Sequence, residues 1–198
     1  MTSLVKTFAF NSVLAHDGVD PWINTYEAEV HMQVITAVHE EYNLAYSRMR
    51  HWFQEIMHDS VLITQDDDRL QAWRDAGMRC VEFPVAPVDQ VIGLMLMSKL
   101  TAMTEGRVMI SQVLVSSPAD EYVKYLCEQG DNLHWFEQPG WWRDIGPNHV
   151  VESKPTRGNG KVISISRNTT WKDHDLDWSA VETTRGNVSI LPTRDPNA

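Results

Sequence analysis

The sequence predicts an α+β fold, with an antiparallel sheet that carries two main helices on one face and a polar C-terminal extension. Residues 26–36 alternate between apolar and polar side chains, as expected for a half-buried strand. Residues 40–57 and 87–103 instead repeat apolar side chains at intervals of three and four, as expected for helices. The predicted order is strand, strand, helix, short strand, helix, strand, which segregates the helices from the antiparallel strands.

The first two strands are predicted at residues 5–13 and 26–36. Residues 5–13 contain the Val and Phe side chains that are common in sheets. Residues 16–21 contain Asp, Gly and Pro and are predicted to form a loop. The second strand has an apolar face and a polar face, the latter carrying Glu27, Glu29, His31 and Gln33. We therefore expect a half-buried antiparallel hairpin.

The first helix is predicted at residues 40–57, where a broad apolar stripe comprises Tyr42, Ala45, Tyr46, Met49, Trp52, Phe53, Ile56 and Met57. A short apolar segment follows at 61–63. Residues 65–74 are polar and include three consecutive aspartates, which suit the N-terminus of a helix. Residues 79–83 are predicted to form a short strand that Pro84 ends.

The second strong helix is predicted at residues 87–103, with Pro87 and Asp89 in favourable positions near its start. Its expected buried residues are Val88, Val91, Ile92, Met95, Leu96, Leu100 and Met103. Residues 107–116 are predicted to form the closing strand. Simple alternation would place Val108 and Ile110 on one face and Met109, Val113 and Val115 on the other.

The charge distribution predicts two parts of the chain. The net charge is −10, and the excess of acidic residues lies entirely within residues 1–150, whereas residues 151–198 are nearly neutral and rich in polar residues. Gly, Pro and Asn cluster near residues 146–155, which suggests a boundary. We therefore expect an α+β body at 1–150 and an extension at 151–198 that packs on the body or on a neighbouring subunit.

Composition also limits the partners and the location. The negative charge disfavours contact with nucleic acid, which requires clustered Lys and Arg. The longest apolar run, residues 91–97, is far shorter than the roughly 20 residues of a membrane-spanning helix, and no secretory signal is visible. The two cysteines, Cys80 and Cys127, form no Cys-x-x-Cys unit. We expect a cytoplasmic protein, or a virion protein if the chain comes from a bacteriophage.

The element order resembles that of a known family. Phe8-Ala9-Phe10 leads to His16, the strand at 26–36 follows, and Phe83-Pro84-Val85-Ala86-Pro87 precedes the second helix. This arrangement, over residues 4–117, resembles the tunnelling fold of the 6-pyruvoyl-tetrahydropterin synthase and 6-carboxy-tetrahydropterin synthase family. The resemblance implies the same strand and helix order and, for an active member, a metal-dependent reaction on a pterin or deazapurine.

The family's functional motifs are not matched. The resemblance places His16 at the first of three zinc-binding histidines, but Trp22-Ile23-Asn24-Thr25 occupies the place of the family's His-Gly-His motif. Val113-Leu114-Val115-Ser116-Ser117 stands where the family has its pterin-binding Glu. The family's catalytic Asp-His pair is represented by His58-Asp59, in reversed order. The resemblance thus implies a degenerate member without the family's metal and catalytic motifs.

One cluster could still bind a metal. Glu29 and His31 share the polar face of the second strand, and a hairpin could bring His16 close to them. Two histidines with a carboxylate form a plausible ligand set for a divalent metal such as zinc. The alternative is that these residues form the solvated face of a half-buried strand. His58-Asp59 is likewise either an acid/base pair or a pair at the C-terminal end of a helix.

Aromatic residues form the most unusual local feature. Residues 134–144 contain Trp135, Trp141, Trp142 and Arg143, punctuated by Pro and Gly, and Trp and Arg are enriched at binding hot spots. The alternative is that the rings close the core of this same chain. Trp171 and Trp178 lie in an otherwise polar region, so we expect them to anchor the extension to a surface.

Two functions remain open from the sequence. The first is a non-catalytic binding or assembly protein, expected to form a homo-oligomer or to bind a protein partner. Its composition suggests that the chain is of bacteriophage origin. Its contacts would come from Trp135, Trp141, Trp142, Arg143, Trp171 and Trp178. The alternative is a metal-dependent enzyme acting on a pterin or deazapurine-type molecule, with zinc bound by His16, Glu29 and His31. No phosphate-binding loop or nucleophile motif favours another enzyme class.

Overall fold

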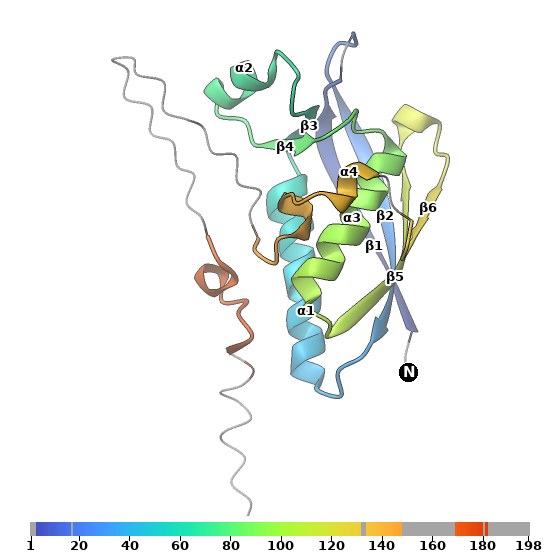
Figure 1. Ribbon diagram of the computed structural model, residues 1–198, viewed down its shortest axis with the longest axis vertical. Helices are drawn as coiled ribbons and strands as arrows, with labels where there is room; N and C mark the ends of the chain where they lie inside the picture. The colour runs from blue at the N-terminus through green and yellow to red at the C-terminus, as the bar shows by residue number, and fades with distance from the viewer. Residues whose placement is uncertain (1–2, 17, 132–133, 148–168, 180, 182–198) are drawn as a thin grey trace, which may run out of the picture.

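A computed structural model describes residues 3–16, 18–131, 134–147, 169–179 and 181. Six strands form one sheet: β1 (Ser3–Leu14), β2 (Trp22–Val34), β3 (Ser60–Thr64), β4 (Cys80–Phe83), β5 (Val108–Ser116) and β6 (Tyr125–Glu128). Their order across the sheet is β4-β3-β1-β2-β5-β6. The two long helices cover one face of this sheet (Figure 1), so the predicted α+β class is confirmed.

The long hairpin of β1 and β2 is the centre of the sheet. The two strands pair antiparallel from Ser3 opposite Gln33 to Leu14 opposite Trp22. The even-numbered residues of β2 from 24 to 32 are buried, and the odd-numbered residues of this stretch are exposed or half-buried, as the alternation predicted. The strand begins at Trp22 rather than at residue 26 because the alternation continues back through Asn24.

A bulge in β5 corrects the prediction for its faces. His31 pairs with Gln112 but the next residue, Met32, pairs with Ile110, so Ser111 is an extra residue in β5. The extra residue shifts the alternation by one position. As a result Val108 and Ile110 face the core together with Val113 and Val115, and all four are at most 1% exposed.

The sheet is mixed, which corrects the prediction of a purely antiparallel sheet. β3 pairs parallel with Ser12–Leu14 at the end of β1, and β4 pairs parallel with β3. The connections through helical segments allow parallel pairing because they carry the chain back along the sheet. The four remaining strands, β1, β2, β5 and β6, are antiparallel neighbours.

The helices are close to those predicted. The main ones are α1 (His39–Trp52), which continues as the π-helical turn η1 (Phe53–Met57), and α3 (Asp89–Thr104). Shorter elements are α2 (Leu70–Asp75), η2 (Pro118–Asp120), α4 (His134–Glu137), η3 (Trp141–Arg143) and η4 (Trp171–His174). No helix in the described part of the chain is long and apolar enough to cross a membrane.

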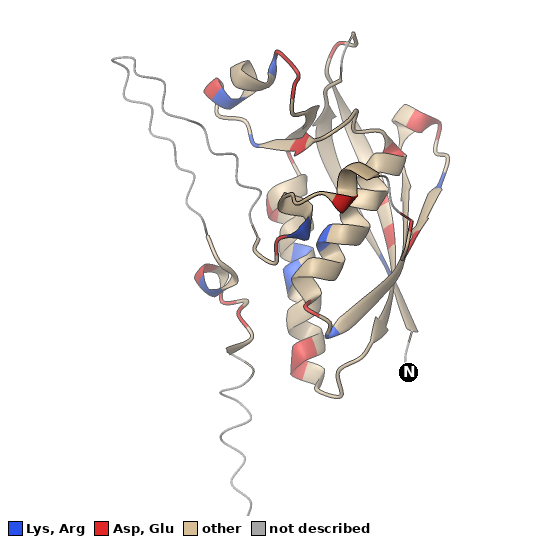
Figure 2. Cartoon of the chain, viewed as in Figure 1, with Lys and Arg blue, Asp and Glu red and all other residues tan. Residues whose placement is uncertain are grey.

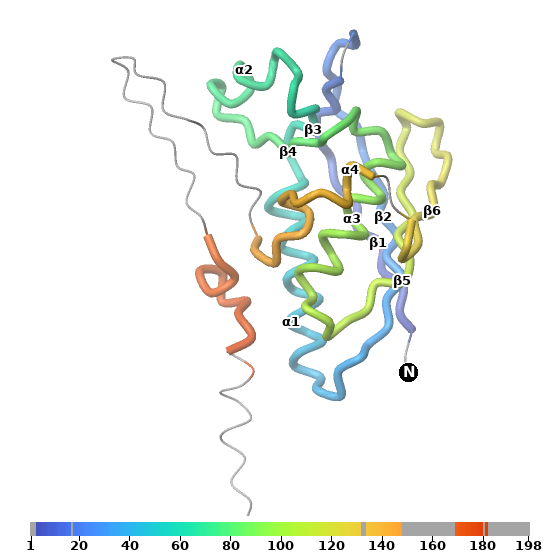
Figure 3. Tube along the Cα trace, viewed as in Figure 1, coloured from blue at the N-terminus to red at the C-terminus, as the bar shows by residue number. Residues whose placement is uncertain are grey.

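The core lies between the helices and the sheet. Phe8 stacks on Phe53 with 4.4 Å between ring centroids, and Phe10 stacks on Tyr26 at 5.0 Å. Trp52 of α1 is fully buried among them. In the trace of the chain (Figure 3), α1 and α3 lie beside one another over the sheet. The side chains on the inner face of β2 are therefore packed between the sheet and the helices.

Candidate functional site

The predicted metal ligands do not converge. Leu14, near His16, pairs with Trp22 at one end of the hairpin, whereas His31 pairs with Val5 near the other. The His16 ring lies 6.1 Å from the Trp22 ring. Trp22 and His31 are nine residues apart on one strand, which corresponds to roughly 30 Å. The hairpin thus separates His16 from His31 instead of joining them.

Glu29 and His31 do lie together. His31 Nε2 is 2.8 Å from Glu29 Oε1, and Lys124 Nζ lies 3.7 Å from the other carboxylate oxygen. The hydrogen bond from His31 is the main cause that lowers the pKa of Glu29. All three side chains are on the outer, partly exposed face of the sheet. In the described residues, no group of three His, Cys, Asp or Glu side chains is placed to hold a metal ion. The residues present therefore do not fit the family's three-histidine zinc site.

His58 has a backbone partner. Its Nδ1 accepts a hydrogen bond from the backbone N–H of Asn11 at 3.2 Å, and its Nε2 lies 3.5 Å from Asp59 Oδ1. Asp59 is mostly exposed and has a positive φ of 56°. The pair thus lies in the turn between η1 and β3, at the end of a helical segment.

The tryptophan-rich segment packs on its own chain. Trp141 donates a hydrogen bond from Nε1 to the carbonyl oxygen of Glu82 at 2.8 Å and stacks against Trp52. Trp142 is buried and donates to the carbonyl oxygen of Phe136 at 3.3 Å. Arg143 donates twice to that same carbonyl oxygen. Trp135 is the most exposed ring of the group, at 36%.

A buried lysine holds this segment in place. Lys99 of α3 is fully buried, and its Nζ donates to the carbonyl oxygens of Trp141, Asp144 and Gly146 at 3.3, 2.7 and 2.8 Å. Burial lowers the pKa of Lys99 to about 8. Sequence reasoning missed this residue. The signal was a single charged residue, Lys99, in the stretch from Val91 to Leu100, whose other residues are apolar except Ser98.

A buried arginine holds the C-terminal segment, which we define as residues 169–179 and 181. Arg48 of α1 is 1% exposed, donates from Nε to the carbonyl oxygen of Leu176 at 2.7 Å, and pairs with Glu105 at 2.7 Å. Its guanidinium lies 4.9 Å from the Trp171 ring and 4.1 Å from the Trp178 ring. Both tryptophan rings thus lie against a side chain of α1 in the same chain. Figure 2 marks the basic residues on α1 and α3.

Trp178 has charged groups around its ring and its indole nitrogen. Arg107 stacks on it at 4.2 Å in addition to Arg48, and Trp178 Nε1 donates to Glu105 Oε1 at 2.7 Å. Trp171 Nε1 donates to the carbonyl oxygen of Ile145. Burial lowers the pKa of Arg48 while Glu105 opposes that shift. The segment is therefore held by directional contacts as well as by apolar packing. The remainder of the predicted extension lies outside the described residues.

A cluster of buried polar atoms lies where α3 begins. Asn24 and Tyr26 of β2 face the helices, next to Asp89 at the start of α3, whose Oδ1 accepts a hydrogen bond from Ser117 Oγ at 2.9 Å. The four residues are at most 2% exposed. Asn24 Nδ2, the Tyr26 hydroxyl and Asp89 Oδ2 have no hydrogen-bond partner among the described residues.

Burial governs the chemistry of this cluster. It raises the pKa of both the Asp89 carboxyl and the Tyr26 hydroxyl above their usual ranges. The residues next to this cluster have exposed apolar side chains. Ile23 precedes Asn24, Val88 precedes Asp89, and Tyr122 is hydrogen-bonded through its backbone to Ser117. The cluster is thus a set of buried polar atoms with unused hydrogen-bonding capacity. Sequence reasoning interpreted Asp89 as a helix-start residue and missed the cluster.

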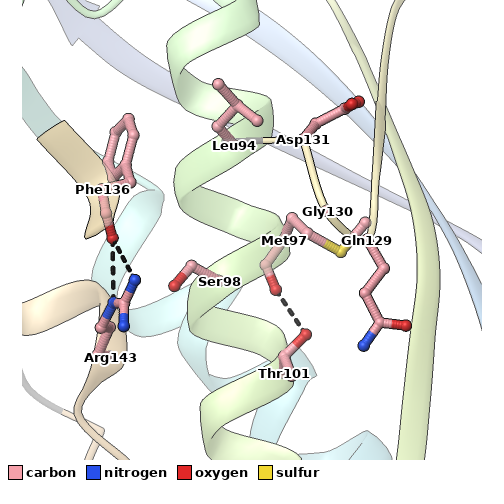
Figure 4. Close-up of a pocket in the computed structure, with 9 residues that line it drawn as sticks. All are labelled: Leu94, Met97, Ser98, Thr101, Gln129, Gly130, Asp131, Phe136 and Arg143. Carbon is pink, nitrogen blue, oxygen red and sulfur yellow. Dashed lines mark hydrogen bonds between the residues drawn. The ribbon is translucent and has the colours of Figure 1, made fainter. Parts of the chain in front are cut away.

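A shallow pocket of about 230 Å³ lies beside α3 (Figure 4). Leu94, Met97, Ser98 and Thr101 of α3 form one wall, and the opposite wall comprises Gln129, Gly130, Asp131, Phe136 and Arg143. The hydrogen bonds of Arg143 to the Phe136 carbonyl hold part of the rim in place. The pocket combines apolar and polar walls, and among the described residues that line it Asp131 and Arg143 are charged.

One edge of the sheet is open over most of a strand. β1 pairs with β2 along its whole length, but β3 covers only Ser12–Leu14. The other edge of β1 therefore has no strand neighbour between Ser3 and Phe10 among the described residues. At the opposite end of the antiparallel part, β6 pairs with β5 and forms the edge of the sheet.

Comparisons with solved structures return proteins of similar fold. An uncharacterized protein from Wolinella succinogenes is 11% identical, with a TM-score of 0.47, over 65% of this chain and 98% of its own. A catalytic-residue mutant of the 6-pyruvoyltetrahydropterin synthase from Plasmodium vivax is 10% identical, with a TM-score of 0.40, over 65% and 97%. The 6-pyruvoyl tetrahydropterin synthase of Plasmodium falciparum is 10% identical, with a TM-score of 0.37, over 65% and 96%.

These likenesses concern the fold alone. Identities of 10–11% and TM-scores below 0.5 transfer neither an activity nor a set of site residues. No family model matches the sequence, and no curated protein matches it either.

Proposed function

We propose that the protein is a non-catalytic assembly and binding protein that forms a closed homo-oligomer through the edges of its sheet. The observation that carries this proposal is the open edge of β1 between Ser3 and Phe10. Long open edges are templates for pairing with another chain, and folded proteins normally cover or interrupt them. The separation of His16 from His31 supports the non-catalytic part of the proposal.

The backbone groups of every second residue of β1 point to the open edge. The N–H of Asn11 donates to His58, and its carbonyl accepts from the N–H of Asp59, so both groups of Asn11 point away from β2. Because N–H and C=O directions alternate along a strand, the same holds for Thr7 and Ala9. Both residues are exposed. No described residue provides a backbone partner for either.

The direction of the strands favours pairing between β1 of one copy and β6 of the next. The series β1, β2, β5, β6 contains three antiparallel pairings, so β1 and β6 run in opposite directions. A copy rotated about an axis roughly along the strands would place its β1 antiparallel to β6 and continue the sheet. Contacts between two different surfaces of this kind give rings when the rotation closes.

Charge favours the same edge. The chain has a net charge of −10, yet β1 contains Lys6 and no acidic residue between Ser3 and Leu14. Another acidic copy is therefore repelled least at this strand. The predicted cytoplasmic or virion location and the bacteriophage origin stay predictions, as does a contact of Trp135 or Arg143 with a partner protein.

The test is a proline at a residue whose N–H points to the open edge. Thr7→Pro removes a donor needed for pairing between copies but none of the β1–β2 hydrogen bonds, so the monomer should keep its fold. We expect native mass spectrometry to give one discrete oligomeric mass for the unchanged chain and the monomer mass for Thr7→Pro.

Thr7→Ala is the matched control because it keeps the backbone N–H, and it should assemble like the unchanged chain. Circular dichroism should show the same secondary structure for all three proteins. A monomeric unchanged chain, an open-ended series of masses, or a Thr7→Pro variant that assembles normally would contradict the proposal.

A further inference from the structure

Two imidazole rings face each other where the C-terminal segment lies on α1. The rings of His51, on α1, and His174, in η4, have centroids 4.3 Å apart and planes tilted by 49°. The edge of the Trp171 ring lies against His51 at 6.0 Å. The contact joins residues that are 123 positions apart in the sequence. It is therefore a tertiary contact between the body and the C-terminal segment.

The nearest partners of the two rings are neutral groups. His174 Nε2 lies 3.1 Å from Thr169 Oγ1, a neutral partner. Carboxylates are within salt-bridge distance of His31 and His58, but of neither His51 nor His174 among the described residues. Both rings are half-buried. Protonation of both would place two positive charges against each other at a site that is only partly open to water.

Other charges near the contact act in both directions. Glu55, on the same helical segment as His51, favours its protonated form, and Asp173 interacts favourably with His174. On the positive side, Arg48 lies one helical turn before His51 and beneath Trp171, and Lys172 is in the same 3-10 turn as His174. The remaining charged neighbours are Glu105 and Arg107, against Arg48 and Trp178, and Asp175 and Asp177 of the segment. Burial, followed by the proximity of His174, lowers the pKa of His51 despite Glu55.

We propose that the His51–His174 contact is a proton-sensitive latch, which holds the C-terminal segment on α1 at neutral pH and releases it when both rings are protonated. Release would expose Trp171 and Trp178, which are 4% and 9% exposed when the segment is docked. It would also leave Arg48 without the Leu176 carbonyl and the two aromatic rings.

The direction of the pH effect follows from proton linkage. Docking lowers the pKa of His51 below its ordinary value of 6.5, so the released segment binds protons more readily than the docked segment. The contribution of His51 to docking is complete above pH 6.5. It is lost as the pH falls from 6.5 through the lowered pKa of the docked residue. Each unit by which docking lowers a histidine pKa weakens docking about tenfold at low pH.

The experiment follows Trp171 and Trp178 in the full chain labelled with 5-fluorotryptophan. Fluorine NMR gives each ring its own resonance, assigned with Trp171→Phe and Trp178→Phe. Urea is added at pH 7.5, 6.5 and 5.5, and the midpoint of the change at each resonance measures docking. We expect the urea midpoints of Trp171 and Trp178 to fall together as the pH is lowered. The resonances of Trp52 and Trp142, which belong to the body, should stay at their folded positions.

His51→Gln and His174→Gln test the contact itself. His51→Gln removes the ring whose pKa docking lowers, so we expect the midpoints for Trp171 and Trp178 to become nearly independent of pH in this range. His174→Gln removes only the neighbouring ring and leaves His51 half-buried, so we expect a weaker pH dependence than in the unchanged chain. His39→Gln, at the other end of α1, is the matched control and should behave like the unchanged chain. The unchanged Trp52 and Trp142 resonances report whether each variant is folded.

Three results would overturn the proposal. The first is a pair of midpoints that do not change with pH in the unchanged chain. The second is the same pH dependence in His51→Gln and His174→Gln as in the unchanged chain. The third is release of the segment only when the whole body unfolds, because a latch must open while the sheet and helices remain intact.

Discussion

Lys99 and Arg48 are buried cations that each bind backbone carbonyl groups from a later part of the chain. Lys99 holds three carbonyls of residues 141–146, and Arg48 holds those of Met103 and Leu176. Burying a charge is unfavourable unless hydrogen bonds and other charges compensate. Lys99 therefore attaches residues 141–146 to α3, and Arg48 attaches the C-terminal segment to α1.

Replacement of Lys99 by Met tests the first attachment. The apolar side chain would leave three carbonyl groups without their donor, and we expect the free energy of unfolding to fall by about 2–3 kcal/mol. Lys124→Met, at an exposed position, is the control and should change it little. Urea unfolding of the three proteins at pH 7 measures the difference.

The same pair of proteins has a defined pH dependence. Because burial lowers the pKa of Lys99 from 10.5 to about 8, the unfolded chain binds more protons than the folded chain between these values. The Lys99 contribution to stability should therefore rise with pH across this window. The difference between the unchanged chain and Lys99→Met should grow from pH 7.5 to pH 9.5, and a constant difference would contradict the lowered pKa.

At the scale of single elements, the bulge in β5 decides which side chains form the core. If Ser111 were paired as a regular residue of the strand, Val108 and Ile110 would point to the outer face of the sheet. With the bulge, both apolar pairs of the strand point inward, on the face that α3 covers. The bulge thus lets a nine-residue strand bury four large side chains on one face.

Deletion of Ser111 should remove the bulge and leave the core unchanged. In the shortened strand Ile110 is followed directly by Gln112, so regular alternation still places Val108 and Ile110 on the same face as Val113 and Val115. We expect the free energy of unfolding, measured by urea unfolding, to stay within about 1 kcal/mol of that of the unchanged chain. Ser111→Ala keeps the strand length and the bulge and should stay within the same range. A loss of about 3 kcal/mol or more on deletion, as expected if Val108 and Ile110 left the core, would contradict this register.

The sequence predicts regular elements well and long-range contacts poorly. The hairpin partner at residues 26–36 was recognisable because its side chains alternate without interruption. The bulge at Ser111 was not, since nearly every side chain around it is apolar and either register looks buried. Likewise, the three apolar residues at 61–63 indicate a buried strand but contain no information on its direction.

The functional residues were harder to predict for a related reason. Trp171 and Trp178 stood out as aromatic residues in a polar region, and their anchoring role could be expected. Their partner Arg48 could not be found in this way, because its acceptor Leu176 is 128 residues away. Asn24, Tyr26 and Asp89 come from two elements, so only the folded structure brings their unpaired atoms together.

At the scale of the whole molecule, net charge and edge pairing act against each other. Each copy carries a net charge of −10, so copies repel one another, whereas hydrogen bonds between open edges attract. Salt weakens the first effect far more than the second, because the Debye length falls from about 10 Å at 0.1 M to about 3 Å at 1 M.

We therefore expect assembly to strengthen as sodium chloride is raised from about 0.1 M to about 1 M. Sedimentation velocity at several protein concentrations would measure this as a lower dissociation constant. Thr7→Pro is the control and should sediment as a monomer at both salt concentrations. Weaker assembly at high salt would indicate an interface held by ion pairs rather than by strand edges.

The separation between Arg48 and its later partners also bears on how the chain folds during synthesis. The carbonyl of Leu176 is made 128 residues after Arg48, which is on the order of 10 s at the usual rates of translation. In that interval β3, β4, β5 and β6 are made and the sheet can be completed, while the guanidinium lacks this acceptor and both tryptophan rings. The body can therefore reach a nearly complete form early, and the arrival of the C-terminal segment is the last event that removes this charge from water.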